Sequence, residues 1–436
     1  MKSLSHPPPL MLKGSILQQL ETVCRHSNRP IRYGVYYKNT LVSLCHALED
    51  HILDKREQPI VITCFQRGKW YLQEADRYRD IAACSQDVVI MATDDAGFAA
   101  HSTSQLPNVN LVELNTTDPL SQEWHLIILA PSYASMVICQ ELSDADYGMQ
   151  GLPTSDLERK FYGMWTFEPD LVLKTTELAI AHIENYNQKL AHKLNSHKQI
   201  IETQMASSEE VEVIVSRVIE YLKSSENTVT SATGKNSLSR NLVSNELQAL
   251  LRMAELIEMR DIENPMAAVQ VAGMAEVMAQ LLDLPPWQIK RLRLAALLHR
   301  IYNLKQNKTN GEVQVLDRMP ELQDIAQIII HQNEWWNGNG VPEGLSGEEI
   351  PLESRILALL MEFQREINQQ HKNPQSMEDM FALALSKCKQ QEQTRFDPEL
   401  INTLNLLVLG LQQGLDLPCM TPKFSNSMWL IDSRQS

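Results

Sequence analysis

The chain has 436 residues, of which 43% are hydrophobic and 21% are charged, and its formal net charge is -15. This length exceeds that of one ordinary compact domain and predicts two or three domains with real hydrophobic cores. The acidic balance argues against nucleic-acid binding, which needs dense Lys and Arg facing phosphate, and no apolar run reaches the roughly 18 residues that span a bilayer.

These features predict a cytoplasmic protein that binds no nucleic acid and spans no membrane. The early segment MKSLSHPPPLMLKGS carries a Pro triplet where a signal peptide needs an unbroken apolar region. The seven cysteines are scattered without a CxxC pair, a pattern typical of buried thiols in a reducing compartment. Protein partners therefore fit the charge balance better than nucleic acid does.

The first third of the chain predicts an α/β fold. Short runs rich in β-branched residues read as strands buried on both faces, and an amphipathic helix at 40–52 lies between the first two. The predicted strands are residues 31–37, 59–65, 87–91, 109–114, 125–129 and 136–139.

Two aromatic segments occur in this region, FQRGKWY at 65–71 and FYGMWTFEPDLVLKTTELA at 161–179. With the order of the strands, they resemble the DICT domain, a sensory module. The resemblance implies an α/β sensory domain over residues 15–170. Four of the aromatic residues either line a ligand pocket or pack in the core, and the sequence leaves both open: Trp70, Tyr71, Trp165 and Phe167.

A helical stalk is predicted at 171–223, with one helix at 171–205 and a second at 209–223. A thin apolar stripe runs along it at three-, four- and seven-residue steps, at Ile183, Tyr186, Leu190, Leu194, Ile201 and Met205. Such a stripe suits a homodimer seam or packing against the stalk's own domain, and both remain open. Residues 224–245 are rich in Ser, Thr and Asn and predict a flexible linker.

The rest of the chain, 246–415, predicts an all-α bundle. Most of the expected helices begin at or near a proline, which suits the first helical turn. They are residues 246–260, 265–282, 286–299, 320–334, 351–370, 376–391 and 398–414.

The most informative stretch is 328–363, IIIHQNEWWNGNGVPEGLSGEEIPLESRILALLMEF. His331 and Glu334 lie three residues apart, on one helix face, and a glycine-rich loop with Pro342 follows at once. This stretch resembles the HD-GYP family of metal-dependent phosphohydrolases, best known for hydrolysing cyclic di-GMP. The positions that match the family in order are Glu334, Gly338, Gly340, Pro342, Gly344, Leu345, Gly347, Glu348, Ile350, Pro351, Arg355 and Ile356.

The departures from the family fall on its reactive positions. Gln332 and Asn333 replace two His ligands, and Met361 replaces the Asp of the following helix. In the GYP-like loop, made of Asn337, Gly338, Gly340, Val341 and Pro342, Asn337 replaces Asp and Val341 replaces Tyr. His331 and Glu362 each lie one residue from a ligand position.

The His-Asp pair that gives HD hydrolases their name is also altered in this chain. His299 stands in place, but Arg300 follows it where the family has an Asp, and an Arg has no lone pair for a metal. The resemblance also puts Ala267 and Asn303 at family His and Lys positions, and another His near Met319 or Pro320. We expect the guanidinium of Arg300 to take the place of a metal, held by Glu334 and Glu362.

The main functional hypothesis is a signalling protein in which a DICT-like domain is coupled to a catalytically inactive HD-GYP-like domain, a pseudoenzyme that contacts signalling proteins. It predicts no catalytic residue and no cofactor. One alternative is a metal-dependent phosphohydrolase of the cyclic di-GMP phosphodiesterase type, with a single divalent Mn, Fe or Mg on His299, His331 and Glu362. Another is a module that binds a cyclic dinucleotide with Arg300, Arg355 and the pair Trp335 and Trp336.

Overall fold

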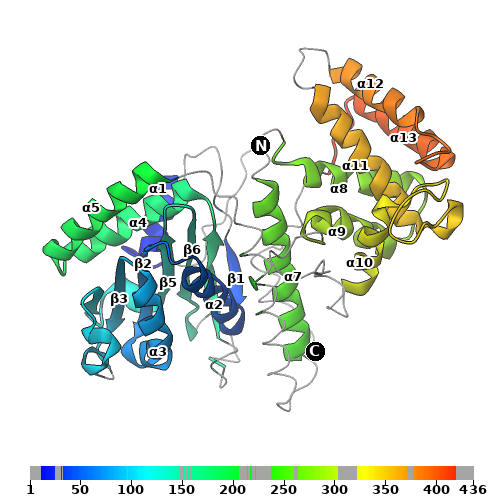
Figure 1. Ribbon diagram of the computed structural model, residues 1–436. Helices are drawn as coiled ribbons and strands as arrows, with labels where there is room; N and C mark the ends of the chain where they lie inside the picture. Colours follow the sequence, from blue (N-terminus) through cyan, green and yellow to red (C-terminus); the bar gives the residue numbers. More distant parts are fainter. Residues whose placement is uncertain are drawn as a thin grey trace. The chain divides into compact units, whose positions relative to one another are not determined.

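A computed structural model gives the fold, and the chain divides into two compact units between Asn245 and Glu246 (Figure 1). The structure describes residues 11–24, 31, 33–95, 97–144, 146–147, 152–153, 156, 159–205, 214, 217–218, 221, 237–259, 264–302, 322–370 and 377–418.

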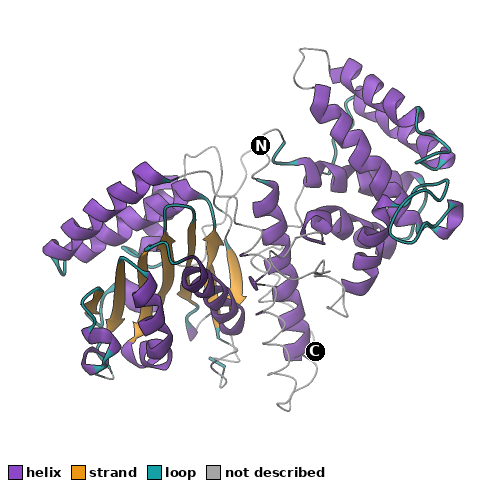
Figure 2. Ribbon diagram, viewed as in Figure 1, coloured by secondary structure: helices purple, strands orange, loops and turns teal. Residues whose placement is uncertain are grey.

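The N-terminal unit is built on a mixed seven-stranded sheet in the order β1-β7-β6-β5-β2-β3-β4 (Figure 2). β2, β3 and β4 run parallel and the other neighbours run antiparallel. The strands are β1 (Gly34–Tyr37), β2 (Ile60–Arg67), β3 (Asp87–Thr93), β4 (Val109–Leu114), β5 (Glu123–Leu129), β6 (Ala134–Glu141) and β7 (Lys160–Thr166). The α/β prediction is confirmed, and the six predicted strands match β1 to β6 within three residues at each end.

β7 is absent from the predicted strands, yet it lies between β1 and β6 and pairs with both. Its sequence KFYGMWT mixes aromatic residues with Gly163, which weakens the β-strand pattern. The structure explains the glycine, because a Cβ there would lie 2.2 Å from the carbonyl oxygen of Ile138 on β6.

Helices cover both faces of this sheet (Figure 1). α2 (Lys38–Lys55) and α3 (Gly68–Cys84) cover one face, where Tyr71 and Tyr78 pack against Phe65 of β2. α1 (Ile16–Cys24), α4 (Pro169–Glu184) and α5 (Gln188–Gln204) cover the other and bury apolar side chains with the sheet. Of the four aromatic residues singled out in the sequence, Tyr71, Trp165 and Phe167 are buried in the core, and Trp70 is half-buried.

The stalk prediction is wrong for residues 171–205. The chain turns at 185–187, and α4 and α5 form a hairpin whose stripe, including Ile183, Leu194 and Ile201, is buried in the sheet's own core. His182 of α4 pairs with Asp118 at 2.9 Å, and His197 of α5 pairs with Asp87. An apolar stripe fits a partner helix or a sheet equally well, so spacing alone did not decide between them. The N-terminal structural unit therefore continues well past residue 170.

The described part of the second predicted stalk helix also packs on this unit. Ile214 and Val218 are buried, and Arg217 forms an ion pair with Asp54 of α2. Residues 224–236 of the predicted linker lie outside the described residues. The prediction of a flexible linker is wrong from Ser237 onward, because α7 (Ser237–Glu258) begins there. The apolar residues of 237–258 keep helical spacing, which outweighs the many Ser and Asn residues at its start.

The C-terminal unit is helical in its described residues, as predicted (Figure 2). After α7 come α8 (Ala267–Leu281), α9 (Pro286–Tyr302), α10 (Gln323–Ile330), α11 (Leu352–Gln370), α12 (Met377–Lys389) and α13 (Pro398–Gln412). α11 contacts α8, α9, α10, α12 and α13, so it forms the centre of the bundle. Within the residues described, no helix is both long and apolar enough to cross a membrane.

Candidate functional site

The glycine-rich loop is organised around one buried carboxylate. α10 ends at Ile330, a single 3-10 turn covers His331–Asn333, and Glu334 begins the loop. The Glu334 side chain accepts backbone N–H bonds from Glu343 at 2.7 Å and from Gly344 and Leu345 at 3.1 Å. Because its oxygens bind the loop's amides, Glu334 shapes the loop rather than facing a metal.

Gly340 is required by close backbone contact. A Cβ at this position would lie 2.2 Å from the backbone nitrogen of Trp335 and 2.4 Å from the Cα of Glu334. No side chain fits at such distances, so the loop folds back on its own first residues only with glycine here. The match of Gly340 to the HD-GYP pattern therefore has a physical cause in this chain.

The loop is also tied to the turn that precedes α13. The backbone N–H of Trp336 donates to the Arg395 carbonyl at 3.1 Å, and that of Asn337 donates to the Thr394 carbonyl at 3.0 Å. Arg355 of α11 lies over the Trp336 ring, with its Cζ 5.5 Å from the ring centroid, and pairs with Asp397 at 2.7 Å. These contacts hold the loop, α11 and the start of α13 together.

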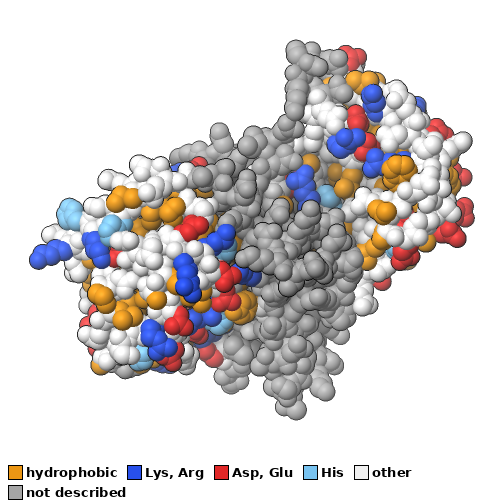
Figure 3. Space-filling model, viewed as in Figure 1, with side chains coloured by type: hydrophobic (Ala, Val, Ile, Leu, Met, Phe, Trp, Pro, Cys, Tyr) orange, Lys and Arg blue, Asp and Glu red, His pale blue; other side chains and the backbone are white. Residues whose placement is uncertain are grey.

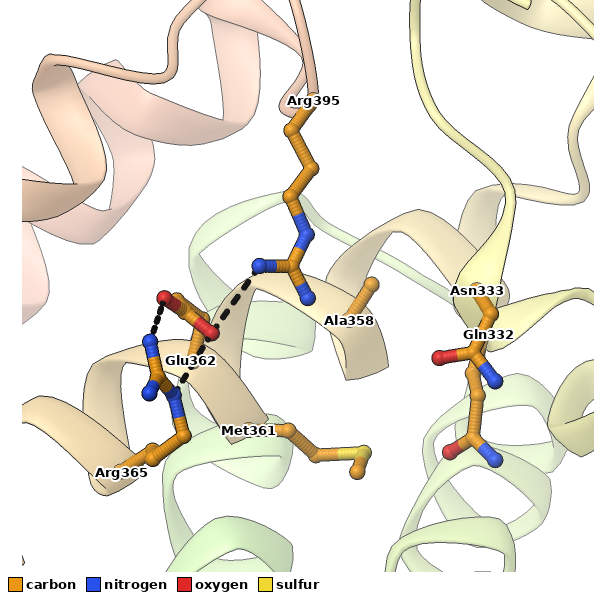
Figure 4. A pocket seen from close by; sticks show the side chains of 7 residues that line it. All are labelled: Gln332, Asn333, Ala358, Met361, Glu362, Arg365 and Arg395. Carbon is orange, nitrogen blue, oxygen red and sulfur yellow. Dashed lines mark hydrogen bonds and ion pairs between the residues drawn. The ribbon is translucent and has the colours of Figure 1, made fainter. Parts of the chain in front are cut away.

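Beside this loop lies a cavity of about 300 Å³ (Figure 4). Gln332 and Asn333 form one side, and Met361, Glu362 and Arg365 of α11 face them, with Arg395 reaching in from the turn before α13. The remaining lining residue is Ala358. The structure thus brings together four of the positions singled out in the sequence and adds two arginines that were not.

Both arginines bind Glu362. Arg365 donates from Nε at 3.0 Å and from Nη2 at 2.5 Å, and Arg395 donates from Nη1 at 3.1 Å. Burial by itself would raise the pKa of Glu362, but the hydrogen bonds from Arg365 and the charge of Arg395 hold that pKa below its ordinary value. The carboxylate is therefore ionised at neutral pH, and its oxygens are already occupied by guanidinium groups.

Gln332 and His331 each leave a buried polar atom without a hydrogen-bond partner. The Gln332 side chain is 5% exposed and its Oε1 accepts no hydrogen bond within the described structure. Nδ1 of His331 lies 3.8 Å from Oε1 of Glu334, which is beyond hydrogen-bond reach. Asn333 is exposed.

His299 and Arg300 make their contacts elsewhere in the bundle. Nδ1 of His299 donates to the carbonyl of Ala296 in the same helix at 2.7 Å, and burial lowers the pKa of His299 to about 4. Nε of Arg300 lies 3.0 Å from Oε2 of Glu258 at the end of α7. The prediction that Glu334 and Glu362 hold Arg300 is wrong, because each acid has other partners and Arg300 meets a third.

The described residues do not bring together a metal centre of the phosphohydrolase type. Throughout the ranges that the structure describes, no three His, Cys, Asp or Glu side chains come close enough to hold a metal ion, so His299, His331 and Glu362 do not form one site. Gln332 and Met361 offer only weak donors there. Asn303, Met319 and Pro320 lie outside the described residues, and Ala267 is buried at the start of α8.

Three family models match parts of the chain. Residues 14–142 match DICT, a sensory domain in diguanylate cyclases and two-component systems, and residues 302–400 match an HD domain. Residues 155–231 match the C-terminal domain of a two-partite extracellular sensor domain. β7 lies in the segment 155–231 and pairs with β1 and β6, which lie in the segment 14–142. The two N-terminal matches therefore describe parts of one sheet.

Curated relatives match over parts of their length. A cyclic di-GMP phosphodiesterase response regulator, RpfG, of Xanthomonas campestris pv. campestris is 29% identical over 182 residues, 36% of this chain and 47% of that protein. A probable cyclic di-GMP phosphodiesterase of Vibrio cholerae is 31% identical over 120 residues, 27% of this chain and 25% of that protein. A cyclic di-GMP phosphodiesterase of Thermotoga maritima is 28% identical over 160 residues, 31% of this chain and 43% of that protein. The chain spans less than half the length of each.

Proposed function

Because this chain joins an N-terminal DICT sensory domain to a C-terminal HD domain, we propose that it is a signalling protein whose HD domain is catalytically inactive and acts through contacts with signalling proteins. The observation that carries the proposal is the cavity around Glu362. There a carboxylate is neutralised by Arg365 and Arg395, and Gln332 and Met361 line the same space. A divalent metal at this point would have to compete with two guanidinium groups for one carboxylate.

A hydrolysis assay tests the proposal that the HD domain is catalytically inactive. The purified full chain is incubated with cyclic di-GMP and Mn(II) or Fe(II), and linear and mononucleotide products are separated by chromatography. The Thermotoga maritima phosphodiesterase, assayed in parallel, is the positive control. We expect no product above the protein-free rate. Hydrolysis that a chelator abolishes would show that the HD domain is an enzyme.

The proposal that the HD domain contacts signalling proteins rests on the glycine-rich loop. Val341 is an apolar side chain that is 61% exposed, and the loop beneath it is fixed by Glu334 and by the turn before α13. A rigid loop with an exposed apolar residue suits protein recognition. In a pull-down from the native host, Val341→Asp should lose the partners that the unmodified chain retains. Leu406→Asp, at a residue that is 56% exposed on α13, is the matched control.

Binding of a cyclic dinucleotide without cleavage is the second candidate, and the cavity favours it over a reduced metal site. Arg365 and Arg395 line the cavity, and Arg395 reaches Glu362 through Nη1, which leaves Nη2 for a phosphate. Arg300 and Arg355, which the sequence suggested for this role, are paired with Glu258 and Asp397. Calorimetry with cyclic di-GMP decides between the candidates, since heat that Arg395→Met removes would favour binding.

The reduced metal site remains the weakest of the three. It needs His299, His331 and Glu362 in one cluster, and the structure does not bring them together. Metal analysis after anaerobic purification should give well under one equivalent per chain. As part of the main proposal we place the protein in the cytoplasm. The six cysteines of the described residues are buried free thiols, which suits a reducing compartment.

A further inference from the structure

Three cations gather around one tryptophan of the sensory domain. Trp70 lies in the first turn of α3, and Nζ of Lys38, from the first residue of α2, is 4.3 Å from its ring centroid. Nζ of Lys69 is 5.5 Å from the same centroid, and Cζ of Arg159 is 5.7 Å from it. Distances of this size are those of cation–π contacts. Three separate segments of the chain therefore place positive charge on one indole.

The ion pairs of this cluster hold Lys38 and Arg159 and leave the ammonium group of Lys69 outside them. Lys38 pairs with Asp156, and Arg159 pairs with Glu141 and, at 3.5 Å, with Asp156. The exposed ammonium of Lys69 forms no ion pair with any carboxylate in the ranges described. The whole chain nevertheless carries a formal net charge of -15. In the coloured parts of the face drawn in Figure 3, Lys and Arg side chains lie among Asp and Glu side chains.

Buried groups fix the position of Arg159. Glu141 at the end of β6 is 8% exposed and pairs with Arg159 from the protein side, while Nε2 of Gln66 donates to the same carboxylate at 3.1 Å. Gln66 has a φ of 62° where the register of β2 shifts, a conformation that a non-glycine residue rarely adopts. A charge held by a buried second layer is oriented before any ligand arrives, which lowers the entropic cost of binding.

The position in the fold also suits a ligand. α3 begins directly after the carboxyl end of β2, whose neighbour β3 is parallel, and ligands of α/β sheets bind outside such strand ends. The N-cap residue of α2 makes no side-chain cap hydrogen bond, so the positive end of that helix adds to the charge of the cations. At α3, the Asp95 carboxylate accepts the backbone N–H of Lys69 at 3.1 Å, which fixes the start of the helix that carries Trp70.

We infer that Lys38, Lys69, Trp70 and Arg159 form a binding site for a small organic anion, held through a phosphate or carboxylate group, and that this site receives the input of the sensory domain. The inference concerns the N-terminal unit alone and stands whether or not the HD domain is inactive. Phosphate and carboxylate groups both present the anionic oxygen atoms that Lys and Arg bind. Only an experiment can therefore tell which of the two groups the site binds.

Isothermal titration calorimetry on the full chain tests the site with inorganic phosphate in one arm and citrate in the other. A third titration with NaCl at matched ionic strength gives the baseline, because screening alone changes the heat of a charged surface. We expect saturable heat, above that of NaCl, with at least one of the two anions. Lys69→Met should weaken that binding about tenfold, since one charge-assisted hydrogen bond is lost. Because Lys69 is exposed, this change should not unfold the domain.

Lys189→Met is the matched control, because Lys189 is an exposed lysine at the start of α5 on the opposite face of the sheet. It should bind the anion as the unmodified chain does. Binding of only phosphate or only citrate identifies the anionic group of the ligand as phosphate or carboxylate. Binding of both supports a site that recognises the anionic oxygens of either group. Heat no greater than that of NaCl with either anion, or equal binding by Lys69→Met and Lys189→Met, would overturn the inference.

Discussion

Arg395 donates from Nη1 to Oε2 of Glu362 over 3.1 Å, although 33 positions separate the two residues in the sequence. The bond joins the turn before α13 to α11, at the cavity where the family resemblance leads one to look for a metal. The guanidinium thus gives the carboxylate a permanent partner that belongs to the chain itself.

Replacing Arg395 by Met should destabilise the HD domain by about 1–2 kcal/mol, because a charge-assisted bond to a mostly buried carboxylate is lost. Since the folded pKa of Glu362 is lowered, its ion pairs stabilise the fold above its ordinary value near 4.5 and lose that effect as the pH falls through the folded pKa. The loss of stability in Arg395→Met should therefore be largest at neutral pH and should shrink as the pH falls below the ordinary value near 4.5. Urea unfolding across pH measures it.

The control for Arg395→Met is Lys387→Met, at an exposed lysine of α12, which should change the unfolding free energy by less than about 0.5 kcal/mol. If Arg395→Met gained a full equivalent of metal, the cavity would be one substitution from a metal site, and the proposed inactivity would be wrong.

Gly340→Ala should disrupt the loop. The added methyl group would lie 2.2 Å from the Trp335 nitrogen, so the loop has to move and Glu334 loses hydrogen bonds from its amides, at a cost of roughly 3 kcal/mol or more. Gly347→Ala is the control, because no atom lies within 4 Å of its Cβ and only its φ of 54° adds strain, about 1 kcal/mol. Amide hydrogen exchange at residues 343–345 should rise in the first variant. Equal exchange in both would contradict the close contact.

His299 should make the HD domain less stable in mild acid. Its folded pKa is about 4, below its ordinary value of 6.5, so the unfolded chain binds the proton first as the pH falls. Stability is then lost from about pH 6.5 downward, by at most roughly 1.4 kcal/mol per pH unit, until the folded pKa is reached. His299→Leu should flatten the profile of unfolding free energy between about pH 6.5 and 4.5. A variant with an unchanged slope would show that His299 is not the group responsible.

Residues 11–142 alone should not fold cooperatively. Without β7 the edges of β1 and β6 lose their partner, and without α4 and α5 one apolar face of the sheet is covered only by α1. Residues 11–223 should unfold in a single transition, because they add β7, the hairpin and Ile214 and Val218. Circular dichroism with thermal melting compares the two. A sharp transition in the shorter fragment would show that the second family match is a separate domain.

Most of the fold is predictable from the sequence, since the signals there are local. Apolar strand runs and proline-initiated helices depend on neighbouring residues, and both units have the expected class. β7 escapes prediction because Gly163 interrupts its pattern, and its place in the sheet is set by contacts with β1 and β6. The stalk is misplaced for a related reason, since an amphipathic helix does not encode which apolar surface it covers.

Part of the cavity's lining is predictable from the sequence, but the partners of its charged side chains are not. Gln332, Asn333, Met361 and Glu362 do share one cavity. Arg365 could have been found, because it lies three residues after Glu362 and an i, i+3 pair meets on a helix. Arg395 had no such signal, since only the tertiary fold brings it to α11. The sequence shows that Arg300 is charged, but it does not show which way the side chain points. In the fold, Arg300 forms an ion pair with Glu258.

The strand order gives the sensory unit a property beyond its stability. Among the described strands, β7 is the last to be synthesised, yet it separates β1 from β6, so the first of these strands has no partner strand until the last one has been made. On the ribosome, Gly34–Tyr37 must wait until Lys160–Thr166 has emerged. It also follows that an exchange of genetic material between relatives that ended near residue 142 would separate strands that depend on one another. The segments matched by the two N-terminal family models are therefore expected to be inherited together.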